Sequence, residues 1–392
     1  MALLTGLKIL DFSCLLPGPY ASMMLADLGA DILRVESHVR TDEIRYFPPM
    51  DGETSAVHGH LNRSKRSLSL DLKKQQAVEL VKRLVQEYDI VLEQFRPGVM
   101  DRLGVGYEQL KRENPRLIYC SLTGFGQTGP YRDRPGHDIN FLAMSGMMGY
   151  SGRKESGPSL LGIQVGDLAG GAMQAAVAML AAVIYRDRTG EGQHLDISMT
   201  DGCFALNAMF GPGALTCGVE PLPAGTMLNG GSFYDFYQTK DGRYFSVGSF
   251  EPSFRKVLCE GLGRLDLLTV ALDDSPDGSR LFAAALRDIF RSKNFAEWQE
   301  VFAAVPACVE PVLSFSEACE HPQLVARGMI ADVPMPDGRL QKQIASPIKS
   351  SVHTPQYRHT GARLGEHTDE VLHELGLNES EVARLREEGV IA

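Results

Sequence analysis

The chain has 392 residues, of which 44% are hydrophobic and 22% charged, a balance that is typical of a folded globular protein. Its formal net charge of −10 argues against general nucleic-acid binding, which depends on Lys and Arg neutralising phosphates, but leaves room for a local basic pocket. The seven cysteines are scattered and form no C-x-x-C pair, so we expect reduced thiols, no disulfide framework and no metal site.

The N-terminus has no basic segment followed by a long apolar run, so we expect no signal peptide and a cytoplasmic protein. The most apolar stretch, residues 168–185, is rich in Ala and Gly and is barely long enough to span a bilayer. We expect a buried helix there and no membrane partner.

In chain order, the first third predicts strands that alternate with helices. Short apolar runs predict strands at residues 7–12, 31–36, 89–93 and 116–122, and helical patterns at 20–28 and 73–87. A Pro-Gly-Pro loop at 17–19 separates the first strand from the first helix. The alternation indicates an α/β fold with a parallel sheet. The turn after the first strand lacks the G-x-G-x-x-G fingerprint, which argues against a nicotinamide-dependent dehydrogenase.

The pattern changes in the middle of the chain. Residues 231–249 predict a hairpin that turns at 240–242, and helical runs follow at 254–261 and 279–290. We predict a smaller α+β domain over residues 225–321. The tail, residues 365–390, predicts two short helices.

Asp167 stands directly before the long Ala-rich helix, in the segment Gly-Asp-Leu-Ala-Gly-Gly. A carboxylate there faces unpaired backbone N–H groups and the positive end of the helix dipole. One interpretation makes Asp167 a plain N-cap, a role that Asp serves well. The other makes it a functional carboxylate, because Gly170 and Gly171 would let a ligand approach the backbone closely.

His137 lies in a loop, Pro-Gly-His-Asp-Ile-Asn, that leads into an apolar stretch rich in Met and Gly. An imidazole in such a loop can serve as a general base near neutral pH, although a lone histidine is more often structural. Asp138 follows directly, but adjacent side chains usually point apart, so Asp138 is not predicted to be the partner of His137.

Cationic residues gather in loops of the first third. In a parallel sheet, ligands bind beyond the carboxyl ends of the strands, where Arg96 is expected to lie. Cations in such loops suit the phosphates of a bulky cofactor, and the alternative is a solvated charged surface. The loop cations are Arg63, Lys65, Arg66, Arg96 and Arg102.

These segments resemble the class III CoA-transferase and α-methylacyl-CoA racemase family over nearly the whole chain. The resemblance rests on several motifs. They are LLPGPY at residues 15–20, LGADILRVE at 28–36, NRSKRSLSLDLK at 62–73, FRPGVMDRLG at 95–104, GFGQTGP at 124–130, GDLAGG at 166–171 and RTGEGQHLD at 188–196.

The resemblance implies a Rossmann-like large domain formed from both chain ends, residues 1–224 and 322–392, with the smaller α+β domain at 225–321 between them. It implies an interlocked homodimer and an acyl-CoA substrate, with coenzyme A as part of that substrate and no tightly bound cofactor. The implied contacts to the coenzyme are Arg63, Lys65, Arg66, Leu72, Lys73, Phe95, Arg96 and Arg102.

The family contains two chemistries that use the same aspartate, here Asp167. In the transferases it attacks the thioester carbonyl, and coenzyme A then passes to an acceptor acid through an aspartyl-CoA thioester. In the racemases it is one of two acid/base groups that exchange the α-proton through an enolate. Backbone N–H groups near the helix start would stabilise the thioester oxygen.

Two residues favour the racemase branch, with the transferase as the alternative. His137 matches the signature residue that supplies the second acid/base group, and Glu251 matches a small-domain glutamate that racemases hold near that histidine. The catalytic set expected from the resemblance is therefore Asp167, His137 and Glu251, acting on a 2-methyl-branched acyl-CoA. The chain departs from the racemase pattern at Phe141, Ile163 and Ser37, where Tyr, Asn and Arg are usual, although Arg40 could replace the missing arginine.

Overall fold

The computed structural model describes all residues, 1–392, and divides into two compact units. Unit 1 comprises Met1–Ser145, Gly162–Leu206 and Pro322–Ala392, and unit 2 comprises Gly146–Leu161 and Asn207–His321. The smaller unit therefore starts before the predicted residue 225 and also takes in 146–161. Hydrogen bonds explain the difference, because Tyr150 bonds Asn207 (Oη–Oδ1, 2.7 Å) and accepts from Asn229 (Nδ2–O, 2.9 Å).

Unit 1 is built on a six-stranded sheet in the order β5-β2-β1-β6-β7-β8, and every neighbouring pair is parallel. The α/β class and the parallel sheet predicted from the sequence are confirmed. The strands are β1 (Lys8–Asp11), β2 (Asp31–Glu36), β5 (Arg66–Ser69), β6 (Ile90–Glu93), β7 (Ile118–Thr123) and β8 (Gln193–Ser198). Hairpins β3–β4 (Met50–Asp51, Thr54–Ser55) and β12–β13 (Ile330–Pro334, Leu340–Ile344) lie outside this sheet.

Unit 1 also contains helices, several of which pack against the sheet. They are α1 (Pro17–Asp27), α2 (Ala56–Leu61), α3 (Gln75–Leu84), α4 (Val99–Leu103), α5 (Tyr107–Glu113), α6 (Asp138–Met144), α7 (Met173–Thr189), α8 (Met199–Ala205), α15 (Pro322–Ala326), α16 (Thr368–Glu374), α17 (Glu379–Glu387), the 3₁₀ turn η1 (Glu43–Tyr46) and the π-helical η3 (Gly166–Ala172). Helix α1 begins at Pro17, inside the predicted loop, because Pro is well suited to the first helical turn.

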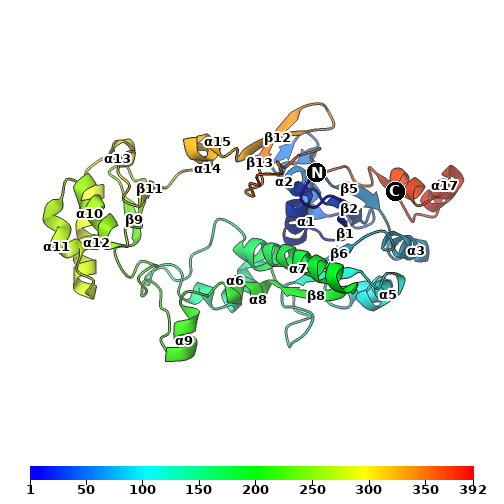
Figure 1. Ribbon diagram of the computed structural model, residues 1–392, viewed down its shortest axis with the longest axis horizontal. Helices are drawn as coiled ribbons and strands as arrows, with labels where there is room; N and C mark the ends of the chain where they lie inside the picture. The colour runs from blue at the N-terminus through cyan, green and yellow to red at the C-terminus, as the bar shows by residue number, and fades with distance from the viewer. The chain divides into compact units, whose positions relative to one another are not determined.

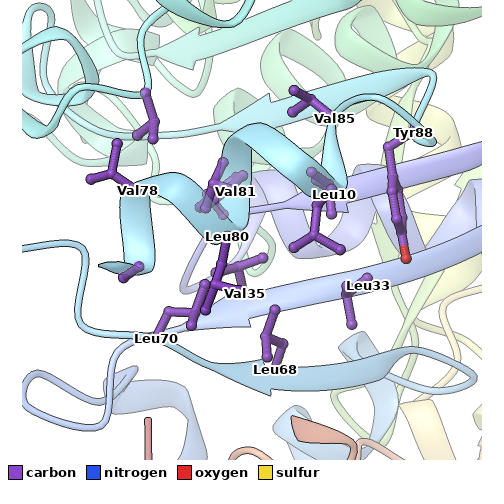
Figure 2. Close-up of a cluster of buried hydrophobic side chains, with 14 of the residues drawn as sticks. Leu10, Leu33, Val35, Leu68, Leu70, Val78, Leu80, Val81, Val85 and Tyr88 are labelled. Carbon is purple, nitrogen blue, oxygen red and sulfur yellow. The ribbon is translucent and has the colours of Figure 1, made fainter. Parts of the chain in front are cut away.

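One face of the sheet carries the largest apolar core. Leu10 pairs in register with Leu33 and Val91, and all three are fully buried. Figure 2 shows Leu10 and Leu33 in this cluster with Val78 and Val81 of α3. Helices α16 and α17 of the chain's end add side chains to the same core, so the large unit is built from both chain ends. On the other face, α1 contacts α7 (Figure 1).

Residues 166–189 form one continuous helical stretch, η3 followed by α7, that is long and apolar enough to cross a membrane by length and composition alone. Core helices of soluble proteins pass the same test. Ala175, Met179 and Ala182 are buried in unit 1, whereas Val177 and Ile184 on the opposite side are more than half exposed. The predicted buried helix is thus buried along one side.

Unit 2 has a small antiparallel sheet of order β11-β10-β9 packed against helices. Its aromatic core includes Phe245, Phe290 and Trp298. The predicted hairpin is present as β9 and β10, joined through residues 239–243. The elements are η2 (Met147–Gly149), α9 (Gly211–Cys217), β9 (Asp235–Gln238), β10 (Tyr244–Val247), α10 (Pro252–Gly261), η4 (Leu265–Leu267), α11 (Leu268–Ala271), α12 (Pro276–Phe290), α13 (Phe295–Phe302), β11 (Val309–Pro311) and α14 (Phe315–Glu320).

Candidate functional site

Asp167 lies in the first turn of η3, partly buried in unit 1. The N-cap position belongs to Val165 and no side chain caps the helix, so the N-cap interpretation of Asp167 is wrong. The backbone N–H of Asp167 instead donates to Oδ1 of Asp138 at 3.0 Å. The Asp167 carboxylate therefore does not cap the helix and is available to act on a substrate.

Glycines around Asp167 let η3 approach its neighbours closely. A Cβ on Gly166 would lie 2.9 Å from the Asp138 carboxylate, and one on Gly170 would lie 2.8 Å from Sγ of Cys203 on α8. Gly170 and Gly171 are buried against protein, so they do not present an open surface to a ligand, contrary to the expectation from sequence. Their function is close packing that fixes the position of Asp167.

The surroundings of Asp167 disfavour its charged form. Burial, with a smaller contribution from the negative charge of Asp138, raises the pKa of Asp167 to about 7. A carboxyl group with such a pKa exists in both protonation states near neutral pH, which is the property that a general acid/base requires.

His137 immediately precedes α6, and its backbone N–H donates to Oδ1 of Asn140 at 3.0 Å. Its side chain is exposed. Asp138, the next residue, holds the Asp167 amide, so one residue and one hydrogen bond separate the two candidate acid/base positions. The sequence did not predict this role for Asp138, because a bond between residues 29 positions apart leaves no local signal.

Phe141, which stands where racemases carry Tyr, is 2% exposed. Its ring lies edge-on to Phe125 at 5.3 Å, and a Cβ on Gly136 would lie 2.6 Å from it. The Phe141 ring thus packs against the loop that carries His137. Phe141, where this chain departs from the racemase pattern, therefore supports that loop by packing.

Three of the predicted coenzyme contacts are already occupied within unit 1. Arg63 is 1% exposed and binds both carboxylate oxygens of Asp27 (Nε–Oδ1 2.9 Å, Nη2–Oδ2 2.6 Å). Lys65 is equally buried and donates to the Pro19 carbonyl at 2.9 Å, and burial lowers the pKa of its ammonium to about 8. Arg66 binds the carboxylates of Glu370 and Glu374 on α16. These cations hold the unit together, and the Lys65 ammonium has three acceptors within the chain, Asp11, Pro19 and Asn62.

We expect Asp27→Ala to lower the free energy of unfolding by about 3–5 kcal/mol, because it leaves the buried Arg63 guanidinium without its counterion. Urea denaturation followed by circular dichroism measures this. Glu87→Ala, which removes an exposed pair with Lys8 at 3.6 Å, is the matched control and should change stability by less than about 1 kcal/mol. Equal, small effects of both substitutions would show that the Asp27–Arg63 pair is not a structural clamp.

The other five predicted contacts lie on loops and the helix that follow the carboxyl ends of β5 and β6. Leu72 and Phe95 are half-buried against the core, which anchors the two loops. Lys73, Arg96 and Arg102 are exposed and make no ion pair. This edge of the sheet therefore presents unpaired cations where parallel α/β sheets bind ligands.

The loop after β2 reaches the same edge. Ser37, which replaces the usual arginine, accepts hydrogen bonds from the backbone of Val39 (3.2 Å) and Arg40 (3.1 Å). Arg40 is exposed and remains the candidate substitute for the missing cation.

Glu251 belongs to unit 2, where it is the exposed N-cap residue of α10, directly before Pro252. Its side chain makes no capping hydrogen bond, so the carboxylate is unoccupied within that unit. All seven cysteines are unpaired.

Comparison with known proteins gives a consistent result. The model of CoA-transferase family III matches residues 4–368. Human alpha-methylacyl-CoA racemase is 36% identical, with 99% of this chain and 97% of that protein covered. Succinate–glutarate CoA-transferase of Agrobacterium fabrum is 35% identical, with 95% of each covered. The crystal structure of a CAIB/BAIF family protein from Brucella suis has a TM-score of 0.81 and 31% identity, covering 95% of this chain and 98% of that one.

Proposed function

Because the chain belongs to CoA-transferase family III, we propose that it is an α-methylacyl-CoA racemase that acts on 2-methyl-branched acyl-CoA thioesters. In this proposal Asp167 and His137 exchange the α-proton, and Glu251 completes the catalytic set that the resemblance implies. The observation that supports the proposal is the hydrogen bond from the Asp167 amide to Asp138, which is the residue directly after His137.

The proposed reaction moves one proton out of, and another into, the same carbon. One of the two groups removes the α-proton and leaves an enolate, and the other returns a proton to the opposite face. Since the pKa of Asp167 is raised to about 7, its carboxyl group can accept the proton when ionised and donate it when protonated. The backbone N–H groups of Val165, Asp167 and Leu168 at the start of η3 are hydrogen-bonded within the chain, so they are not the free donors expected to stabilise the enolate oxygen.

The alternative function is a class III CoA-transferase. It is supported by relatives named as CoA-transferases at 35% identity, close to the 36% of the human racemase. In that chemistry the Asp167 carboxylate attacks the thioester carbon, forming a mixed anhydride and releasing the coenzyme thiolate. The thiolate then returns to give the aspartyl-CoA thioester and the free acid. A nucleophilic carboxylate must be ionised, so transfer by Asp167 should fall as the pH drops below about 7.

A direct test separates the two functions. We expect one pure epimer of a 2-methylacyl-CoA, incubated without any acceptor acid, to become a mixture of both epimers, as resolved by chiral chromatography. Retention of the single epimer, together with transfer of coenzyme A once carboxylic acids are added, would establish the transferase instead.

Arg96→Ala should weaken the binding of free coenzyme A about tenfold, because a charge-assisted hydrogen bond to phosphate is lost. Isothermal titration calorimetry measures the affinity. Arg112→Ala, which removes another exposed arginine of unit 1 on α5, is the matched control and should bind normally. The same affinity in both variants would remove Arg96 from the coenzyme site.

We also propose that the active form is a homodimer. Met173, Val177 and Ile184 expose 44%, 65% and 54% of their surface along one side of α7, and exposed apolar patches of this kind can mark protein–protein interfaces. Light scattering coupled to size exclusion gives the mass in solution, and a monomer at micromolar concentration would contradict the proposal.

A further inference from the structure

Glu93 is a buried carboxyl group that the proposed chemistry does not use. It is the last residue of β6, it is 4% exposed, and it makes no ion pair. Its Oε2 accepts the backbone N–H of Phe95 at 2.8 Å. This bond fixes Phe95, the residue directly before Arg96 in the loop that follows β6.

A chain of hydrogen bonds leads from Glu93 toward solvent. Ser121 of β7 is its register partner and hydrogen-bonds its carboxyl group. The Ser121 hydroxyl also lies 3.0 Å from Nε2 of His194 on β8. The His194 ring is exposed on one side and stacks on Tyr107 at 5.1 Å, which fixes its orientation.

The hydrogen bonds that link Glu93, Ser121 and His194 can be arranged in two ways, which differ in the direction of each bond. When Glu93 is ionised, Ser121 donates to it, and His194 Nε2–H donates to Ser121. When Glu93 is protonated, it donates to Ser121, which then donates to an unprotonated Nε2. The proton moves through hydrogen-bonded atoms in both directions, so the buried carboxyl group can exchange it with solvent through His194.

The charges around Glu93 oppose its ionisation. Burial raises the pKa of Glu93 to about 7, helped by the negative charge of Asp101 on α4 and opposed by the bonds from Ser121 and Phe95. Burial and the negative charge of Glu93 raise the pKa values of Tyr119 and Cys120 on β7, which stay neutral. The carboxylates that act on His194 are Asp196, Asp101 and Glu108. On the side of β1 its neighbour is the apolar Phe12. The cations Arg96, in the loop, and Arg102, on α4, are exposed.

We propose that Glu93, Ser121 and His194 form a proton-responsive support of the coenzyme-binding loop, which holds Phe95 and Arg96 in place when Glu93 is ionised and loosens them when it is protonated. An ionised carboxylate accepts the Phe95 N–H about twice as strongly as a neutral one. Affinity for coenzyme A should therefore rise with pH across neutrality. Glu93 is a positioning residue in this account, which rests on the proposed function only in taking coenzyme A as the ligand.

The test compares the affinity of free coenzyme A for the full-length wild type and Glu93→Gln by calorimetry between about pH 6 and about pH 8. The ratio of the two affinities cancels the titration of the ligand's own phosphates. We expect the wild type to bind about fivefold more tightly than Glu93→Gln at the upper pH, and the two to converge at the lower pH. A constant ratio would overturn the proposal.

Two further variants keep the test decisive. Ser121→Ala removes a donor to ionised Glu93 and should move the midpoint of the affinity change to higher pH, whereas an unmoved midpoint contradicts the proposed relay. Glu113→Gln, an exposed glutamate of α5 without an ion pair, should reproduce the wild-type profile. Absence of coenzyme A binding at every pH would refute the proposed function itself, and binding with parallel profiles would refute only the role of Glu93.

Discussion

Asp167→Asn should lose at least about a thousandfold in turnover in either chemistry, because an amide can neither exchange the α-proton nor form the covalent intermediate. The protein should stay folded, since the bond that fixes this turn uses the backbone N–H of residue 167 and not its side chain. Initial rates at saturating acyl-CoA, with circular dichroism as a check of folding, measure this. Exposed Asp133→Asn is the control and should keep wild-type turnover.

The same substitution should stabilise the protein at alkaline pH. The pKa of Asp167 is raised from 3.8 to about 7 in the folded state, so ionisation costs free energy there that the unfolded chain does not incur. Above about pH 7 the whole penalty is present, it shrinks as the pH falls toward 4, and it vanishes below 4. We expect Asp167→Asn to be more stable than the wild type by about 4 kcal/mol at pH 8 and about equal to it at pH 4.

Near-normal turnover by Asp167→Asn would rule out both mechanisms. Lower stability at pH 8 would show that the ionised carboxylate has a favourable partner in the folded protein. The substitution would then lower both activity and stability. Replacing a functional carboxylate that is held in an unfavourable environment should instead lower activity and raise stability.

His137→Ala should abolish α-proton exchange, lowering its rate by about a hundredfold to ten-thousandfold, because one of the two acid/base groups is lost. The packing beneath should survive, since Phe141 and the bond between Asp138 and Asp167 do not depend on the imidazole. If the enzyme is a transferase, the same variant should keep most acyl transfer, because Asp167 alone is the nucleophile.

Parallel assays of α-proton exchange and of coenzyme transfer separate these outcomes. His373→Ala, which removes a partly exposed histidine on α16, should leave both rates unchanged. An equal and severe loss of transfer in His137→Ala would contradict the assignment of His137 to proton exchange.

Local sequence patterns predicted the first strands of the sheet because those strands are continuous apolar runs buried on both faces. Strand β8 was missed, since Gln193, His194 and Asp196 interrupt its apolar residues at the edge of the sheet. The boundary of unit 2 was placed too late, because the hydrogen bonds of Tyr150 to residues 207 and 229 join distant segments.

In the candidate site, too, contacts between residues far apart in the sequence could not be predicted from local patterns. Asp167 and His137 were identified from short motifs, but the bond that brings their positions together comes from Asp138 and has no local signature. The loop cations look alike in the sequence. The structure separates Arg63, which Asp27 neutralises from 36 residues away, from Arg96, which has no ion pair.

Proton exchange at the α-carbon tests the central claim most directly. A 2-methylacyl-CoA is incubated with the enzyme in deuterated water, without any acceptor acid, and the α-position is followed by NMR. The racemase account predicts that deuterium replaces the α-proton while the thioester stays intact, and that Asp167→Asn and His137→Ala do not catalyse it. No exchange with several branched thioesters would contradict that account and leave Asp167 as the nucleophile of a transferase.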